Sequence, residues 1–173
     1  MSREEAMNRY QDVGKQAASV GLEYNFDKMI PTNTFDAHRL ALLAAQYGKR
    51  EQMVERLFFA YFTESKHIGD AETLVALAKE VGLDGEEVAK MLAGDQFTKE
   101  VREDEQEAAN LGVRGVPFFV INRKYGLSGA QPTEIFLQAL EKAWQEENPL
   151  TMMGGDGAVC DDTGCEIPDK KNK

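Results

Sequence analysis

The sequence has few cysteines, few basic residues and no long hydrophobic run. Its 173 residues include two cysteines, and 20 lysines and arginines stand against 30 aspartates and glutamates, for a net charge of −10. No stretch of 18 apolar residues occurs, so we expect no membrane-spanning helix. Clustered Lys and Arg, the footprint of nucleic-acid binding, are also missing. The composition therefore excludes membranes and nucleic acids as expected partners.

The N-terminus lacks the features of a secretory signal. Residues 1–5 read Met-Ser-Arg-Glu-Glu, and no apolar segment follows them, whereas a signal peptide carries such a segment. This predicts a cytoplasmic location. The remaining composition, 42% apolar and 29% charged, is typical of a globular protein long enough to bury a core without disulfides.

The first 112 residues have the apolar periodicity of helices, with residues that favour helix starts and ends between the periodic segments. Apolar residues recur at helical spacing between residues that favour helix starts and glycines that favour helix ends. The starts are Asn33-Thr34, Asp70, Asp84 and Asp95, and the ends are Gly21, Gly48, Gly82, Gly94 and Gly112. The pattern predicts six helices joined by short turns.

A change of period after residue 112 predicts two strands and a final helix. Residues 116–121 form a compact run rich in β formers, residues 122–124 suit a turn, and residues 125–128 suit a second strand. Pro132 suits the first turn of a helix. The apolar face of that helix would consist of Phe136, Leu137, Leu140 and Trp144.

The predicted hairpin is incomplete by itself. Residues 118–121 are apolar on both faces of the strand, so both faces need cover. One hairpin and one helix do not provide it. We expect cover from the helical region, from another subunit in a homodimer or from an upstream segment. Because the hairpin has an unpaired edge, the chain alone should be poorly stable or self-associating.

Several segments resemble the FrnE-type members of the DsbA-like family of thioredoxin-fold proteins. Residues 33–40, Asn-Thr-Phe-Asp-Ala-His-Arg-Leu, are similar to a signature of that family's helical insertion. Residues 115–120, Gly-Val-Pro-Phe-Phe-Val, are similar to its cis-proline loop, and residues 125–132 and 160–168 to its downstream segments. The resemblance is nearly full-length for this chain.

The resemblance implies an α/β, thioredoxin-like fold of the DsbA type. Residues 1–112 would form an all-helical insertion domain, residues 113–147 the C-terminal ββα half, and residues 148–173 a tail with a Cys-x4-Cys pair. The family pattern opens with a strand, a Cys-x-x-Cys at a helix start and a second strand, but this chain has no cysteine before Cys160. We therefore expect a truncated form that begins at an internal methionine, lacks the N-terminal part of the sheet and is mostly α.

The implied activity is that of a thiol–disulfide oxidoreductase. The substrate would be a thiol or disulfide protein or peptide, with a redox partner or glutathione as further partner and no cofactor. Two alternatives stay open. One is a non-catalytic module that binds a peptide or protein partner, and the other is a relative of glutathione-dependent isomerases and transferases.

Cys160 and Cys165 are the candidate catalytic residues, as an auxiliary redox pair. The four residues between them form turns readily, so the two sulfurs can meet. A disulfide that closes so small a loop stabilises little, which favours a reversible pair over a staple. Half of a zinc site and two inert thiols are the alternatives, although zinc normally has four ligands and no histidine is near in sequence. Asp161 and Asp162 should disfavour the thiolates and slow exchange at neutral pH.

Val116, Pro117, His38 and Asn33 are the candidate substrate-binding residues. By resemblance, a cis bond before Pro117 turns the backbone of Val116 outward, where an extended substrate can pair with it. An ordinary trans proline opening a strand is the alternative. The segment of Asn33 and His38 would border the groove, although a hydrogen-bonded helix residue is the simpler interpretation of His38. The aromatic residues of the third helix are interpreted as core: Phe58, Phe59, Tyr61 and Phe62.

Overall fold

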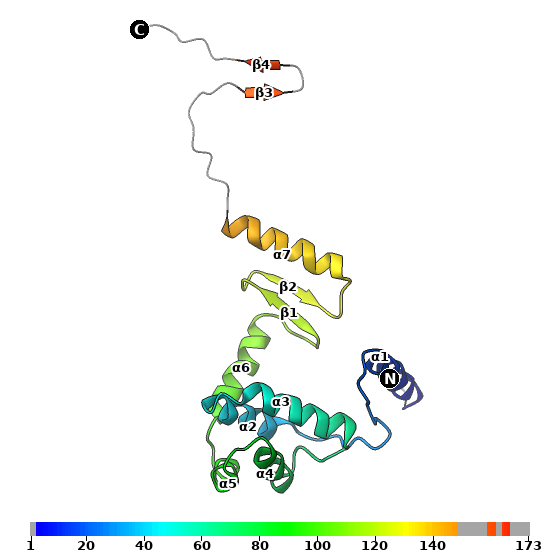
Figure 1. Cartoon of the computed structure of the whole chain (residues 1–173), viewed down its shortest axis with the longest axis vertical. Helices are drawn as coiled ribbons and strands as arrows, with labels where there is room; N and C mark the ends of the chain where they lie inside the picture. The colour runs from blue at the N-terminus through cyan, green and yellow to red at the C-terminus, as the bar shows by residue number, and fades with distance from the viewer. Residues whose placement is uncertain (1–2, 149–158, 162–163, 167–173) are drawn as a thin grey trace. The chain divides into compact units, whose positions relative to one another are not determined.

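The chain divides into two compact units, Met1–Asn110 and Leu111–Lys173 (Figure 1). The computed structural model describes residues 3–148, 159–161 and 164–166, and the side chains of residues 8 and 10–148. This part is mostly helical, and a hairpin and a helix follow residue 112, as the sequence predicts. None of its helices has the length and apolar character that a membrane crossing needs. The three-part division into residues 1–112, 113–147 and 148–173 stays a proposal.

The first unit contains all six predicted helices. They are α1 (Arg3–Ser19), α2 (Phe35–Gln46), α3 (Arg50–Phe58) with the π-helical turn η1 (Phe59–Thr63), α4 (Ala71–Glu80), α5 (Gly85–Ala93) and α6 (Thr98–Asn110). The carboxylate of Asp70 accepts the backbone N–H of Thr73, and that of Asp84 accepts those of Glu86 and Glu87. These bonds satisfy orphan donors at the helix starts. α6 begins three residues after the predicted cap Asp95.

The core of the first unit lies between α2, α3, α4 and α5. Its largest fully buried side chains are Leu40, Leu43, Met53, Leu74, Leu77, Val88 and Met91. They come from the apolar stripes of four amphipathic helices, because residues three and four apart share a helix face. This packing positions α2 and α3, which line the pocket described below.

Arg39 of α2 is the one buried charged side chain in the described part of the chain, with 4% of its surface exposed. Its Nη2 donates to the carbonyl oxygens of Met91 at 2.6 Å and Gly94 at 2.7 Å, and its Nε to that of Gln96 at 2.8 Å. Its Nη1 forms an ion pair with Asp36 at 2.8 Å. One guanidinium thus ties α2 to the end of α5 and to the connection before α6.

The second unit contains β1 (Phe118–Ile121), β2 (Tyr125–Ser128) and α7 (Thr133–Glu147). The strands are antiparallel, with Phe118 opposite Ser128 and Ile121 opposite Tyr125. α7 packs on one face, where the ring of Phe136 meets that of Phe119 edge to face at 4.8 Å. The hydroxyl of Tyr125 donates to Glu146 of α7, which fixes the helix against the hairpin.

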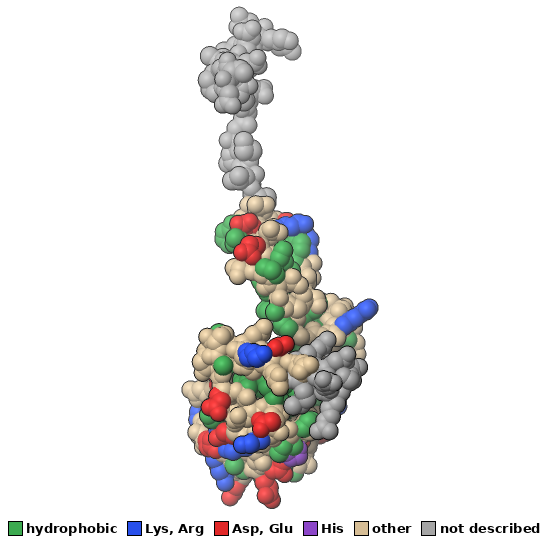
Figure 2. Space-filling view, turned by 90° about the vertical axis from the view of Figure 1, so that its right-hand side faces the viewer, with side chains coloured by type: hydrophobic (Ala, Val, Ile, Leu, Met, Phe, Trp, Pro, Cys, Tyr) green, Lys and Arg blue, Asp and Glu red, His purple; other side chains and the backbone are tan. Residues whose placement is uncertain are grey.

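Much apolar surface of the second unit is uncovered. Ala143 is the one buried residue among the described residues of this unit. Figure 2 shows hydrophobic side chains of this unit, coloured green, at the molecular surface. The exposed set is Val116, Phe119, Val120, Ile135, Leu137, Leu140 and Trp144. The hairpin and its helix therefore lack cover within their own unit, as the sequence argument expected.

A second hairpin follows in the tail. β3 (Val159–Asp161) and β4 (Gly164–Glu166) are antiparallel strands joined by two residues. The sequence pattern did not predict these strands. The other tail residues, 149–158 and 167–173, lie outside the described part of the chain.

Candidate functional site

The loop before β1 presents its backbone at the surface. The Val116–Pro117 peptide bond is cis, as the resemblance predicted. The carbonyl oxygen of Pro117 accepts the N–H of Gly129 at 2.8 Å, which extends the β1–β2 ladder by one bond. Gly129 has a φ of +82°, a left-handed conformation that glycine adopts without strain. Val116 lies just outside this ladder and is 91% exposed, so it is accessible to another chain.

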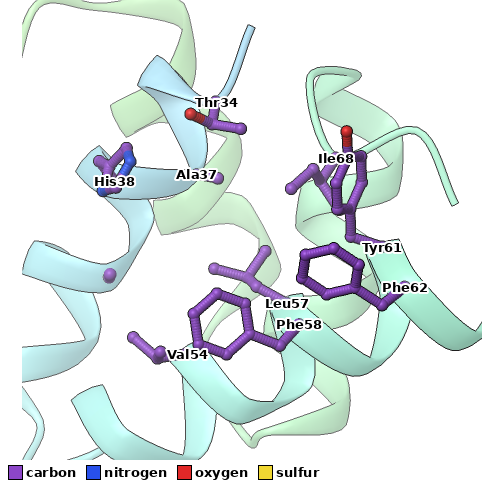
Figure 3. A pocket seen from close by; sticks show the side chains of 10 residues that line it. Thr34, Ala37, His38, Val54, Leu57, Phe58, Tyr61, Phe62 and Ile68 are labelled. Atoms are coloured by element: carbon purple, nitrogen blue, oxygen red, sulfur yellow. The ribbon is translucent and has the colours of Figure 1, made fainter. Parts of the chain in front are cut away.

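An apolar pocket of about 290 Å³ lies in the first unit between α2 and the α3–η1 segment (Figure 3). Thr34 and His38 line one side, and Tyr61 and Phe62 lie across from them. The other lining residues are Ala37, Ala41, Val54, Leu57, Phe58 and Ile68. With this lining, the pocket suits an aliphatic or aromatic side chain of a ligand rather than a charged group.

The two predicted binding residues of this segment differ in role. His38 lines the pocket and its side chain is exposed, so a ligand can reach the imidazole. The side-chain oxygen of Asn33 accepts the N–H of Phe35 at 2.9 Å, a local bond that supports the start of α2. The geometry therefore gives Asn33 a structural contact, and its predicted role in substrate binding stays a prediction.

The interpretation of the aromatic residues as core is wrong for two of them. Phe58 and Phe59 are 55% and 52% exposed. Phe58 ends α3 and Phe59 begins the π-helical turn, whose wider bond from Glu64 N to Phe59 O changes which of the later side chains share a helix face. Residues 58–62 form a run with no polar position. This run was the one signal in the sequence for exposed aromatic residues, because a single helix face cannot bury five consecutive side chains.

A network of charged side chains lies beside the exposed ring of Phe59. Arg56 pairs with Glu64 at 2.8 Å and with Glu80 at 2.6 Å, and Lys66 reaches Glu64 at 3.1 Å. Burial alone would lower the pKa of Arg56, but hydrogen bonds to Glu80 and Glu64 outweigh it and raise that pKa. The guanidinium also lies 5.6 Å from the ring centre of Phe59, a cation–π distance. The ring of Phe59 thus lies against the Arg56 guanidinium, whereas Phe58 lines the pocket.

Cys160 and Cys165 are directly opposite each other in the β3–β4 register. Opposed residues of antiparallel strands have Cα atoms about 4.5–5.5 Å apart, within the range of about 4.4–6.8 Å that a disulfide spans. The backbone thus brings the two predicted redox residues together. Their side chains are outside the described set.

The predicted site residues belong to three separate segments of the chain. Asn33 and His38 lie in the first unit, Val116 and Pro117 precede β1 in the second, and the cysteines lie in the tail hairpin. Among the residues that the structure describes, no cluster of His, Cys, Asp or Glu is arranged to hold a metal ion. The chemistry available to these places is peptide binding at the first two and sulfur exchange at the third.

Comparisons with known proteins agree with this geometry. A family model described as DSBA-like thioredoxin domain matches residues 2–141. The "Uncharacterized protein YwbO" of Bacillus subtilis is 31% identical over 126 residues, which are 72% of this chain and 62% of that protein. The crystal structure of a "probable DsbA oxidoreductase" from Streptomyces coelicolor is 44% identical with a TM-score of 0.77, over 98% of this chain and 72% of that one. The chain thus spans less than two thirds of the curated relative.

Proposed function

Because the chain belongs to the DsbA-like thioredoxin domain family and shares its fold, we propose that it takes part in thiol–disulfide exchange. The observation that carries the proposal is the register that sets Cys160 opposite Cys165. These are the two thiols of the 173 residues, so any exchange chemistry of this chain must pass through them. Membership of the FrnE type and a cytoplasmic location are part of the proposal.

In the proposed reaction the pair passes between a dithiol and a disulfide. A substrate thiolate attacks one sulfur of the oxidised pair, forms a mixed disulfide and releases the other cysteine as thiolate. A second thiolate of the substrate then attacks the substrate sulfur of the mixed disulfide and releases the protein cysteine as thiolate, so that the substrate leaves as a disulfide and the pair is left reduced. The exposed backbone at Val116 would hold an extended substrate by strand addition.

The first test measures the redox equilibrium of the full chain. The protein is equilibrated in buffers of graded thiol–disulfide ratio, alkylated and weighed by mass spectrometry. We expect one reversible two-electron transition, lost in Cys160→Ser and in Cys165→Ser, with thermal stability nearly unchanged. A large loss of stability in either variant would instead indicate a structural disulfide or a metal site.

Catalysis is tested by the reduction of insulin with dithiothreitol. We expect the wild-type chain to accelerate turnover and Cys160→Ser to abolish the acceleration. Absence of turnover in the wild type, together with peptide binding, would favour the non-catalytic module. Tight binding of glutathione would favour the isomerase or transferase alternative.

The non-catalytic binding module has a specific observation in its favour, the apolar pocket beside His38. Phe58 lines the pocket and Phe59 does not, although their exposed fractions are nearly equal. Phe58→Ala should therefore weaken the binding of an aromatic-containing peptide, and Phe59→Ala serves as the matched control. Equal effects of the two substitutions would argue against the pocket.

A further inference from the structure

We propose that the pocket between α2 and the α3–η1 segment binds an aromatic ring that carries a hydroxyl group, either a free phenol or the side chain of a tyrosine. The inference rests on the pocket of the binding module described above and does not depend on the cysteine pair. The shared chemistry is a flat apolar ring with one neutral group that both donates and accepts hydrogen bonds.

The apolar part of the pocket indicates a ligand with an aromatic body. Val54, Leu57 and Phe58 line the lower half of the cavity in Figure 3. The ring centre of Phe58 is 6.2 Å from that of Phe62, which is 5.0 Å from that of Tyr61, so that three successive rings border the cavity. Aromatic rings attract one another at such distances in edge-to-face and offset arrangements. A ring in the pocket therefore gains contacts that an aliphatic chain does not.

The size and charge of the pocket limit the ligand further. Its volume is about 290 Å³, whereas an apolar cavity of about 150 Å³ already holds one benzene ring. The pocket thus has room for a ring with a substituent. None of its lining residues is Asp, Glu, Lys or Arg, so a charged ligand would lose its hydration without gaining a counter-ion. The ligand expected is small and uncharged.

Thr34, His38 and Tyr61 bring polar groups to the same pocket. Within the part of the chain that the structure describes, their side-chain oxygens and nitrogens have no hydrogen-bond partner. Thr34 directly precedes α2, yet its hydroxyl does not cap the helix. The two hydroxyls and the imidazole lie in the upper half of Figure 3, apart from the apolar side chains below. Because each of these groups can donate and accept when neutral, they suit a hydroxyl group on the ligand.

This arrangement predicts which of two nearly isosteric ligands binds more tightly. p-Cresol differs from toluene by one hydroxyl group. In a purely apolar pocket that hydroxyl would lose its bonds to water, and p-cresol would bind more weakly than toluene. A hydrogen bond to one of the three polar side chains instead raises the affinity for p-cresol by about two- to tenfold. The order of the two affinities therefore reports whether the polar groups take part.

The experiment titrates the full chain with p-cresol, toluene and p-toluate and follows the backbone amides of α2 and α3 by NMR. Thr34→Val/His38→Leu/Tyr61→Phe removes the polar groups and nearly retains the volume of the lining. Tyr61→Phe alone removes one of them with the least disturbance of the fold. Tyr47→Phe is the matched control, because the hydroxyl of Tyr47 bonds to Glu87 and Tyr47 does not line the pocket.

We expect the wild type and Tyr47→Phe to bind p-cresol about tenfold more tightly than toluene, and p-toluate more weakly than p-cresol. The preference for p-cresol should shrink in Tyr61→Phe and reverse in the triple variant. Capped Gly-Tyr-Gly and Gly-Phe-Gly peptides then identify the source of the ring. Binding of the tyrosine peptide as tightly as p-cresol indicates a polypeptide, and binding of p-cresol alone indicates a free phenol.

Four outcomes would overturn the inference: toluene binding the wild type at least as tightly as p-cresol, p-toluate binding most tightly, an unchanged preference in the triple variant, or no shift with any probe. Equal binding of the tyrosine and phenylalanine peptides would also contradict it while leaving the binding module in place. Cys160→Ser/Cys165→Ser should bind p-cresol as the wild type does. Failure of thiol–disulfide exchange and failure of phenol binding are therefore separate results.

Discussion

The Nη2 of Arg39 donates to the carbonyl oxygen of Met91 at 2.6 Å, 52 residues further along the chain. Met91 is in the last turn of α5, where carbonyl groups have no partner within the helix. A buried cation therefore acts as the C-terminal cap of another helix. The capped oxygens and the carboxylate of Asp36 together compensate the burial of the charge.

Arg39→Lys should destabilise the first unit although it keeps the charge. A lysine has a single ammonium group and does not reproduce the planar fork that reaches three carbonyl oxygens and a carboxylate. We expect a loss of about 3–5 kcal/mol in the free energy of unfolding, typical for breaking a buried charge network. Urea unfolding followed by circular dichroism measures it. Arg102→Lys, at an exposed position, is the control and should change little.

Gly69→Ala and Gly14→Ala should have opposite effects. A Cβ at Gly69 would lie 2.0 Å from Oγ1 of Thr32 and 2.9 Å from the carbonyl oxygen of Asn33, so the turn must shift at a cost of about 1–3 kcal/mol. A Cβ at Gly14 within α1 would make ordinary contacts near 3.9 Å with Phe26 and should add about 0.5–1 kcal/mol. Both differences are measured by urea unfolding. A neutral Gly69→Ala would contradict the tight approach of these segments.

Acid should remove the contributions of two helix caps. Backbone N–H groups of Glu87 and Glu86 hold the pKa of Asp84 below its ordinary value, and the N–H of Thr73 does so for Asp70. Since the folded pKa is the lower one, each stabilisation is full above the unfolded pKa and is lost as the pH falls through the folded value. Asp84→Ala should therefore lower Tm at pH 7 and differ less from the wild type below about pH 4. A Tm difference that stays constant down to pH 2 would contradict this.

Arg123→Gly should stabilise the β1–β2 hairpin. Asn122 and Arg123 both have positive φ, 51° and 56°, the left-handed region that glycine adopts without strain. Removing the Cβ of an arginine in this region relieves about 1 kcal/mol of strain, partly offset by the greater chain entropy of glycine. Thermal unfolding against the wild type measures the net gain. Lys124→Gly, one residue later, is the control and should not stabilise.

The sequence predicted those elements whose signals are local. Asp70 and Asp84 marked helix starts because their carboxylates bond to amides two or three residues away, and β1 was expected from the run of β formers at residues 116–121. The π-helical turn at residues 59–63 was missed; Arg56, just before it, bonds to Glu80, 24 residues further along the chain, and no local motif encodes such a contact. For the same reason the exposure of Phe58 was missed.

In the candidate site, the sequence predicted only those features that a short motif marks. The cis bond at Val116 followed from a resemblance of six residues, and the opposition of Cys160 and Cys165 from the turn-forming residues between them. The pocket required knowledge of which side chains of α2 and α3 face each other, and no motif encodes that. The local contact between Asn33 and Phe35 agrees with the prediction of a helix start at Asn33-Thr34, whereas the binding role of Asn33 came from the resemblance.

The uneven distribution of buried side chains has a consequence for where the structure opens locally. Nearly all of the solvent-excluded residues belong to α2–α5, and the hairpin with α7 has Ala143 alone among its described residues. Slowly exchanging backbone amides should therefore be confined to α2–α5 in hydrogen–deuterium exchange, because local opening is easiest where few apolar contacts are broken. The surface that presents Val116 to a substrate thus belongs to the part of the chain that opens most readily, and a bound substrate would be expected to slow exchange there.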